Sequence, residues 1–216
     1  MIENSSRDAT STKARILLSA RTEFAGHGVA GARVDLIAAM AKVNKRMIYE
    51  YFGNKDTLFE RVVSDAQLAS AAAEEGMGLD HMSPLNALET FAERKWNFCQ
   101  THPEEVAILY GGRDKQESYR PALDASQSAR SALSLEFRNM VERGVSLGVF
   151  RNELDPVYLH LTISSLAYCL SNNFFQILVV PSLCSIPTRD MQMRFELYLQ
   201  MIAGCAHKQL VKDNAD

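Results

Sequence analysis

The chain has 216 residues, of which 47% are hydrophobic and 23% charged, with a formal net charge of −3. These values exclude a disordered or fibrous chain and fit a globular protein of one or two domains. Prolines (six) and glycines (eleven) are few, which favours helix. We find no strand pattern strong enough to predict a sheet, and we expect an all-α fold of about nine helices.

The first element is a helix that we predict at residues 9–27. It ends at the Gly-His-Gly sequence of residues 26–28, which is a good helix stop. Residues 1–9 lack the apolar core of a signal peptide, and we expect them to form a flexible tail. The apolar positions that recur at helical spacing are Ile16, Leu17, Ala20 and Phe24.

Two short helices and a longer one follow. The third helix begins at Asn44, a favourable N-cap, and ends at Gly53, and Asn54 caps a fourth helix that starts at Lys55. The short spacing between the second and third helices predicts a helix-turn-helix at about residues 33–52. The apolar positions of the second helix are Val34, Ile37, Ala38 and Ala41.

Prolines mark the starts of most later helices. Proline is tolerated in the first turn of a helix, so Pro84, Pro103, Pro121 and Pro156 each predict a helix start. A last helix is predicted after Pro187. The expected ranges are 84–101, 103–109, 121–147, 156–180 and 188–209.

Residues 156–188 contain no Asp, Glu, Lys or Arg, which raises the alternative of a membrane span. A spanning helix needs about 20 predominantly apolar residues, and polar side chains within it are costly in lipid. A helix that is apolar nearly all round is, in a protein surrounded by water, a buried one, so we expect no membrane contact. The polar side chains of this run include His160, Thr162, Ser164, Ser165, Ser171, Asn172, Asn173 and Gln176.

The basic charges of the chain gather near its N-terminal end. Residues 1–62 hold ten Lys or Arg against seven Asp or Glu, a balance of +3, whereas the remainder has a balance of −6. Lys55 lies in the first turn of a helix, where a cation opposes the helix dipole unless an anion such as a phosphate binds there. These features predict an anionic partner, against the alternative that the charges only solvate a helical hairpin.

The third helix has the composition of a DNA recognition helix. Such a helix needs a buried side, small residues where it crosses the preceding helix, and polar side chains aimed at the groove. The small residues are Ala38 and Ala41. The buried side is formed by Val43, Ile48 and Phe52. The residues left for the exposed side, whose side chains can contact phosphates or base edges, are Asn44, Lys45, Arg46, Tyr49 and Tyr51.

Glu50 is the one anion within residues 42–55. It lies four residues after Arg46, which is the spacing of a helical ion pair. Glu50 either holds that guanidinium in place for a base edge or accepts from a cytosine amino group. In both cases we expect it to raise selectivity for sequence and to lower affinity.

From Thr10 to Val63 the sequence resembles the TetR-type transcriptional regulators. The resemblance rests on TKARILLSARTEFAGHG, VDLIAAMAKVNKRMIYEYF and GNKDTLF. It implies a helix-turn-helix DNA-binding domain at 10–62 and an effector-binding and dimerisation domain at 63–216. It further implies a homodimeric repressor that binds a palindromic operator in double-stranded DNA and is released by a small molecule. The most specific matches are Ile37, Ala38, Ala41, Val43, Ile48, Tyr49, Tyr51, Phe52, Lys55 and Leu58.

The resemblance also implies roles for single residues. Asn44 stands where the family often has a serine that contacts phosphate or base. Lys45 and Arg46 match the exposed start of the recognition helix, where family members read sequence. The positions that commonly contact the DNA backbone are occupied by Arg33, Tyr49 and Lys55.

Three positions depart from the family pattern. Lys42 replaces the glycine between the two helices, and we expect a strained or altered turn. Ala32 replaces the usual hydroxyl cap, so the second helix is expected to be poorly capped or to start at a neighbour. Glu50 stands where a neutral residue that faces the groove is common. These departures affect the detailed contacts and not the fold.

The C-terminal half resembles the family only in its layout. There, two terminal helices pack against their copies in the dimer, and the helices at about 157–180 and 188–209 suit that role. The alternative is that the charge-free helix is the core helix of one protomer. Candidates for a pocket for a hydrophobic or aromatic effector, each alternatively an ordinary core residue, are Trp96, Tyr110, Phe137, Tyr168 and Asn172.

Other functions find little support in the sequence. The four cysteines lie far apart and the five histidines are isolated, so we expect no metal site, no disulfide framework and a reducing, cytoplasmic setting. No glycine-rich phosphate loop or nucleophile elbow is present, and we expect no enzyme activity and no cofactor. The remaining alternative is a helical protein–protein interaction module without DNA binding, which would have no reason to place Lys55 against a helix dipole.

Overall fold

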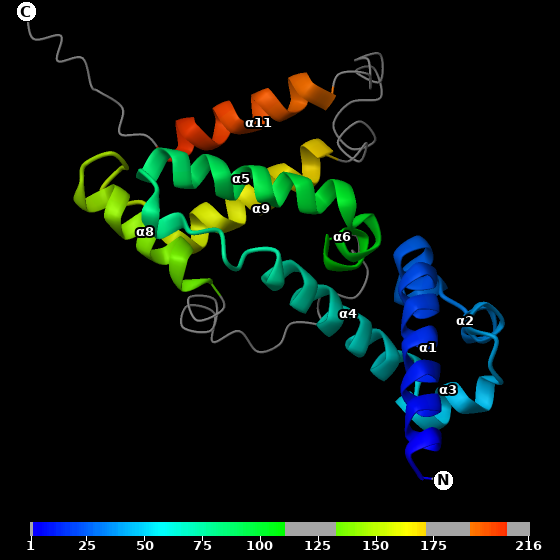
Figure 1. The fold of residues 1–216 in the computed structure, drawn as a ribbon. Coiled ribbons are helices and arrows are strands. Elements are labelled where there is room, and N and C mark those ends of the chain that lie inside the picture. Colours follow the sequence, from blue (N-terminus) through cyan, green and yellow to red (C-terminus); the bar gives the residue numbers. More distant parts are fainter. Residues whose placement is uncertain (1, 111–132, 172–190, 207–216) are drawn as a thin grey trace, which may run out of the picture. The chain divides into compact units, whose positions relative to one another are not determined.

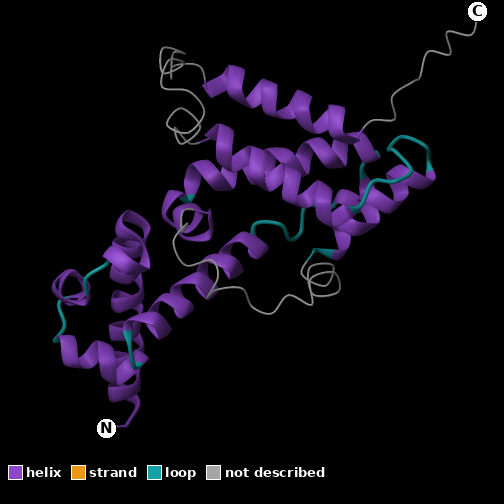
Figure 2. Cartoon of the chain, turned by 180° about the vertical axis from the view of Figure 1, so that it is seen from behind, coloured by secondary structure: helices purple, strands orange, loops and turns teal. Residues whose placement is uncertain are grey.

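The computed structural model describes residues 2–110, 133–171 and 191–206. These residues form nine α-helices and one short 3-10 helix, with no strand among them, which confirms the all-α class (Figures 1 and 2). The chain divides into two compact units. The first holds the described residues up to Ser70 and those from His102 to Tyr110, and the second holds Ala71–Thr101 and the described residues from Leu133 onward.

The first unit begins with α1 (Ile2–Gly31), which is longer than the helix predicted at 9–27. Residues 2–9 are helical, so the helix starts earlier than predicted, while the flexibility expected of residues 1–9 stays a prediction. No proline or glycine interrupts this stretch, and the helix therefore continues toward the N-terminus. Gly28 has φ 63°, outside the helical region, which agrees with the predicted stop at residues 26–28.

The other helices of this unit pack with α1 into one apolar core. They are α2 (Val34–Ala41), α3 (Lys45–Phe52), α4 (Lys55–Ala72) and α6 (Pro103–Tyr110). The predicted domain boundary between residues 62 and 63 lies within α4, and it stays a prediction. The core includes, as expected from their spacing, Ile16, Ala20, Phe24, Val34, Ile37, Ala38, Ala41 and Ile48, with Leu17, Val43 and Phe52 partly buried against it.

The turn between α2 and α3 has the altered backbone that the lysine at its centre predicts. Lys42 adopts the left-handed conformation, with φ 55° and ψ 47°, and is the one non-glycine residue with positive φ in the described part of the chain. A side chain in this conformation costs about 1–2 kcal/mol. Backbone hydrogen bonds offset part of this cost, since the Lys42 N–H donates to Ala39 and the Val43 N–H donates to Ala38.

Side chains satisfy backbone N–H groups at the starts of α2, α3 and α4. Asn44 Oδ1 accepts from the Arg46 N–H at 2.9 Å, and Asn54 Oδ1 accepts from the Thr57 N–H at 2.9 Å, as predicted caps should. At the start of α2 the cap residue is Arg33, the neighbour of Ala32, and its side chain makes no cap bond. A carboxylate from α1 compensates, because Glu23 Oε1 accepts from the Arg33 N–H at 2.9 Å.

The second unit is built from α5 (Pro84–Thr101), α8 (Leu135–Ser146), α9 (Pro156–Ser171) and α11 (Met191–Ala206). In this unit α5, α9 and α11 lie side by side (Figures 1 and 2). Prolines occupy the first position of α5, α6 and α9, as predicted. The ends of the helices predicted at 156–180 and 188–209 lie partly outside the described residues.

The helix predicted at 121–147 is not continuous, and the prediction of one unbroken helix was wrong at Ser134. Within the described residues, α8 begins only at Leu135, because Ser134 is its cap and has a non-helical ψ of 144°. The Ser134 hydroxyl accepts from the Phe137 N–H at 3.3 Å. A serine ahead of Glu136, an acidic residue in the first turn, was a signal for this start. Pro121 itself lies outside the described residues.

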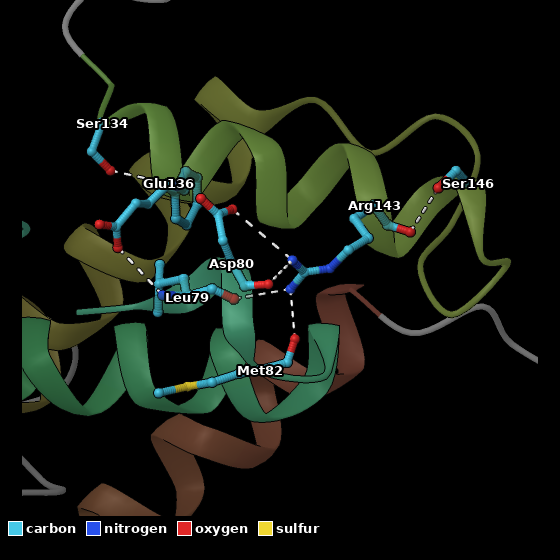
Figure 3. Close-up of polar contacts among 8 residues, drawn as sticks. Leu79, Asp80, Met82, Ser134, Glu136, Arg143 and Ser146 are labelled. Carbon is cyan, nitrogen blue, oxygen red and sulfur yellow. Dashed lines mark hydrogen bonds and ion pairs between the residues drawn. The ribbon is translucent and has the colours of Figure 1, made fainter. Parts of the chain in front are cut away.

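A short 3-10 helix, η1 (Leu79–His81), is anchored on α8 by two charged side chains (Figure 3). The Arg143 guanidinium donates to the backbone carbonyls of Leu79 at 2.9 Å, Asp80 at 2.8 Å and Met82 at 2.6 Å. Glu136 Oε2 accepts from the Leu79 N–H at 3.3 Å. These bonds fix the segment before α5 to α8, and no local pattern in the sequence predicted them.

The described part of α9 has two different sides. Leu159, Ile163 and Ala167 are buried in the unit, whereas Tyr158 and Leu161 are 73% and 54% exposed. One side of this helix is therefore protomer core, as one of the two alternatives holds, and the other side is an open apolar surface. None of the helices in the ranges that the structure describes is long and apolar enough to cross a membrane.

Candidate nucleic-acid interface

The helix α3 is fixed to the core by one side and open on the other. Ile48 is 1% exposed, and Ala38 and Ala41 of the neighbouring α2 are buried, as expected for two helices that cross closely. The residues predicted for the open side that are exposed are Asn44, Lys45, Arg46, Tyr49 and Glu50. The structure therefore brings these five residues together on one short helix and its cap.

Tyr51 does not lie on this open side, and the prediction that it does was wrong. Its ring is half-buried against the core of the first unit. The ammonium of Lys13 lies 5.3 Å from the ring centroid, and Phe52 contacts it edge to face. Residues three apart share one face of a helix, so the distance from Ile48 was a signal for this burial. A DNA contact by Tyr51 stays a prediction that its burial does not favour.

Both cations of α3 are held by carboxylates. Arg46 Nε lies 2.9 Å from Glu50 Oε1, which confirms the ion pair predicted from their spacing. Lys45 Nζ lies 2.8 Å from Asp35 Oδ1 of α2, a pair that the sequence did not predict. The hydrogen bond between Lys45 and Asp35 lowers the pKa of the carboxyl and raises the pKa of the ammonium.

The remaining predicted contacts lie at the ends of helices. Arg33 is exposed at the start of α2. Lys55 is half-buried, and its ammonium donates to the backbone carbonyls of Ala30 at 3.4 Å and Ala32 at 3.3 Å. The chain thus supplies acceptors for Lys55 itself. The position of this lysine at a helix start is therefore weaker support for an anionic partner than the sequence indicated.

Two cavities in the described residues, one in each unit, are lined by none of the candidate effector residues. Trp96 is buried beside α11, 5.3 Å from the ring of Tyr198, and Phe137 is fully buried, 4.3 Å from the ring of Phe91. Tyr168 is half-buried on α9. The first unit contains Tyr110, and Asn172 lies outside the described residues. A cavity of about 250 Å³ between α5 and α11 is lined by Leu85, Leu88, Glu89, Ala92, Leu199, Gln200, Ile202 and Ala203.

The second unit contains a buried charged cluster that sequence reasoning missed. Lys95 Nζ lies 2.6 Å from Glu74 Oε1, and His160 Nε2 lies 3.0 Å from Glu74 Oε2. Burial alone would raise the pKa of Glu74, but the hydrogen bond from His160 and the charge of Lys95 lower it. The prediction that the histidines are isolated was therefore wrong for His160. The signal was a lysine on the apolar side of α5, where a charge needs a partner.

Metal binding finds no support in the part of the chain that the structure describes. No group of three or more His, Cys, Asp or Glu side chains there is arranged to hold a metal ion. The cluster of Glu74, Lys95 and His160 contains a cation and a histidine that share one carboxylate. It is a set of paired charges rather than a set of metal ligands.

Comparison with known proteins decides the family. Residues 16–62 match the family described as bacterial regulatory proteins, tetR family, and residues 84–185 match the tetracyclin repressor-like C-terminal domain. The HTH-type transcriptional repressor NicS of Pseudomonas putida is 34% identical over 172 residues, which cover 77% of this chain and 79% of NicS. The chain belongs to the TetR family. As a member, it is a DNA-binding transcriptional regulator that responds to a ligand, and the alternative of a plain interaction module is not favoured.

Other TetR-family proteins support the same assignment. The HTH-type transcriptional repressor SCO4008 of Streptomyces coelicolor is 40% identical over 106 residues, which cover 48% of this chain and 50% of that protein. A regulatory protein of the tetR family from Rhodococcus RHA1 has a TM-score of 0.68 at 17% identity, covering 91% of this chain and 97% of its own. A TetR-family transcriptional regulator from Haemophilus influenzae has a TM-score of 0.63 at 17% identity, covering 92% and 98%. At these identities the two structures establish the fold.

Proposed function

We propose that the chain is a repressor that binds a palindromic operator as a homodimer and is released by a small-molecule effector. The observation that carries this proposal is the open side of α3. Cations and hydrogen-bonding side chains lie together there, while Ile48 on the opposite side packs into the core. The names of two relatives, both repressors, support the sign of regulation. The chain would act in the cytoplasm, and by binding rather than by catalysis.

The proposed contacts are of two kinds, those to base edges and those to the DNA backbone. Lys45 and Arg46 lie at the start of α3, the part of a recognition helix that reaches base edges. The oxygen of the Asn44 amide is occupied by its cap bond, so we assign its nitrogen as a donor to phosphate or base. The residues proposed to contact the DNA backbone are Arg33, Tyr49 and Lys55.

The proposed dimer would use the open sides of α9 and α11. Large apolar side chains on these helices face solvent in the single chain, and covering them in a dimer would be favourable. A two-fold dimer also matches a palindromic operator, because each protomer would present its α3 to one half-site. The exposed side chains are Tyr158, Leu161, Met191, Met193, Leu197 and Met201.

The effector site is proposed in the second unit, around Trp96, Phe137 and Tyr168. Their aromatic rings would suit a hydrophobic or aromatic effector, which would have to enter where Trp96 packs on Tyr198 or where Phe137 packs on Phe91 in the single chain. The ligand would act by favouring a conformation in which the two copies of α3 no longer match the half-sites. This coupling predicts that ligand and operator weaken each other's binding to the same extent.

Selection from a pool of random duplex DNA tests the proposal. The full-length protein is expected to enrich an inverted repeat whose half-sites are about one helical turn apart, or a multiple of it. Enrichment of no sequence at moderate salt would overturn the DNA-binding proposal. Enrichment of a single, unrepeated half-site would retain DNA binding and overturn the proposed dimer on a palindrome.

A further inference from the structure

The surface proposed to meet DNA contains a carboxylate that has no assigned role. Asp35 lies in the first turn of α2, two residues after Arg33, and its side chain is 61% exposed. Its Oδ1 is 2.8 Å from the ammonium of Lys45 on α3. Asp35 therefore lies next to a residue proposed to read bases and close in sequence to one proposed to grip the backbone.

The pair between Asp35 and Lys45 joins the two helices of the helix-turn-helix across their turn. No glycine lies in that turn, and Lys42 adopts the left-handed conformation that a glycine would adopt without strain. The start of α2 also favours a negative side chain through the helix dipole. The hydrogen bond from Lys45, then the charge of Lys45, and last the charge of Arg33 lower the pKa of Asp35, so the carboxylate stays ionised at neutral pH.

The stability of the fold does not account for this arrangement. Both partners are largely in solvent, with side chains 44% and 61% exposed, and exposed ion pairs contribute little to folding. The effect on DNA is larger, because a phosphate that approaches Lys45 also approaches Asp35. A carboxylate within the Debye length of about 10 Å at 0.1 M salt repels every phosphate in that range, whatever the sequence.

The ammonium of Lys45 can bond Asp35 and a DNA base at the same time, because it has more than one donor. A lysine has three N–H donors, and one of them is used by Asp35. The others can reach the O6 and N7 acceptors of a guanine without breaking the pair. A non-specific complex, in contrast, gains its affinity from phosphates, which compete with the carboxylate for the same charge.

We infer that Asp35 is a positioning residue for sequence reading: it holds the Lys45 ammonium toward a base edge and, where the matching base is absent, competes with the phosphates of DNA for that ammonium. This inference rests on the proposed function. Each of the two cations of α3 would then be positioned by a carboxylate, Arg46 by Glu50 and Lys45 by Asp35. Glu50 holds Arg46 from within the same helix, whereas Asp35 holds Lys45 from the neighbouring helix.

The test compares Asp35→Asn with the wild-type protein on two probes, a duplex selected by the wild type and a random-sequence duplex of equal length. Affinity for the random duplex is expected to rise roughly threefold to tenfold, with a slope of log affinity against log salt that is steeper by up to about one unit, because Lys45 becomes free to neutralise a phosphate. Affinity for the selected duplex should change less. The ratio of the two affinities therefore falls.

A matched control separates this effect from a general change in charge. Asp65 on α4 forms a similar exposed pair with Arg61, at 3.1 Å, and lines a surface with α1 and α6 rather than with α3. Asp65→Asn adds the same charge and is expected to leave the affinity ratio unchanged. An equal fall of the ratio in both variants would overturn the inference.

A double variant tests whether Asp35 acts through Lys45. In a Lys45→Ala background, Asp35→Asn should leave the affinity ratio where Lys45→Ala alone puts it, because the direct repulsion of phosphates by Asp35 acts on both duplexes alike. A change of the same size with and without Lys45 would show that Asp35 acts by another route and would overturn the inference. If the wild type selects a sequence and Asp35→Asn keeps its affinity ratio, the inference alone fails. If the wild type selects no sequence, the proposed function and the inference fail together.

Discussion

The ion pairs on α2 and α3 of the first unit differ in exposure from the pair between Lys95 and Glu74 in the second unit. In the first unit the ion pairs on α2 and α3 are exposed, with the Arg46 side chain 85% in solvent. In the second unit the pair between Lys95 and Glu74 is buried, with side chains 5% and 9% exposed. An exposed pair can exchange one partner for a phosphate at little cost, whereas a buried pair cannot. The exposed pairs on α2 and α3 are therefore suited to the proposed recognition of DNA, whereas the buried pair is suited to a structural role.

The exposure of apolar side chains differs in the opposite direction, being greater on α9 and α11 than on α3. On α9 and α11 of the second unit, several large apolar side chains face solvent in the single chain, whereas α3 presents mainly polar and charged ones. An open apolar surface favours contact with another protein surface, and an open charged surface favours contact with DNA. The two units are thus suited to different partners, and variants in each should fail in different assays.

The largest effect is expected from removal of the buried carboxylate. Glu74→Ala leaves the Lys95 ammonium buried without its ion pair, and it should lower the free energy of unfolding by about 3–5 kcal/mol. Chemical denaturation measures this loss. Asp65→Asn, which breaks an exposed pair, should cost less than about 1 kcal/mol. Equal losses in the two variants would contradict the contrast between buried and exposed pairs.

The same carboxylate predicts a dependence on pH. The pKa of Glu74 is lowered in the folded state, so its stabilising contribution is complete above the ordinary carboxyl pKa of 4.5 and is lost as the pH falls through the lower folded value. The difference in stability between wild type and Glu74→Ala should therefore shrink on acidification below about pH 4.5. A difference that grows in acid would contradict this account.

The next effect concerns the apolar surface of the second unit. Leu161→Glu combined with Leu197→Glu places charges on the open sides of α9 and α11, where both leucines are about half exposed. Sedimentation analysis should show a monomer, and operator affinity should fall roughly 100-fold or more because the two half-sites are no longer bound by a linked pair. Leu135→Glu on α8, where the leucine is 64% exposed, is the control and should remain a dimer.

A smaller effect separates the residues proposed to touch DNA. Tyr49→Ala and Lys55→Ala should weaken binding to all duplexes alike, whereas Lys45→Ala and Arg46→Ala should change which duplexes are preferred, by about tenfold at a single position. Binding to a set of single-base variants of the selected operator measures both. The stability of Lys55→Ala is measured in parallel, because Lys55 also bonds the carbonyls of Ala30 and Ala32. Equal losses on every duplex for all four variants would contradict the division.

The smallest effect is expected at Glu50. Glu50→Gln removes the charge that holds Arg46 at 2.9 Å and should tighten binding to a random duplex by roughly threefold, with a matching loss of selectivity. Filter binding at several salt concentrations measures the change. Weaker binding to the random duplex would show that Glu50 supports affinity, contrary to its assigned role.

Local spacing predicted much of the first unit. The caps at Asn44 and Asn54, the buried Ile48 and the pair of Arg46 with Glu50 all depend on residues within four positions of each other, which a helix brings together by its own geometry. The error at Tyr51 was avoidable on the same ground. Local interactions of this kind can be predicted from the sequence because no other element is needed to form them.

The features that escaped prediction join residues far apart in the sequence. The pair of Asp35 with Lys45 crosses a turn, and Glu74 meets His160 over 86 positions. Arg143 binds η1 over more than 60 positions. No periodicity relates such residues, since their contact depends on how helices pack. A single charged residue on an apolar helix side indicates that a partner exists, but not which residue it is.

The most direct test of the central claim is a footprint of the full-length protein on the duplex that it selects. The account predicts two protected half-sites related by an inverted repeat, with protection at both lost in the Leu161→Glu, Leu197→Glu variant and the preferred bases changed in Arg46→Ala. Protection without a repeat, or protection that is the same in wild type and Arg46→Ala at every base, would contradict a dimer that reads DNA through α3.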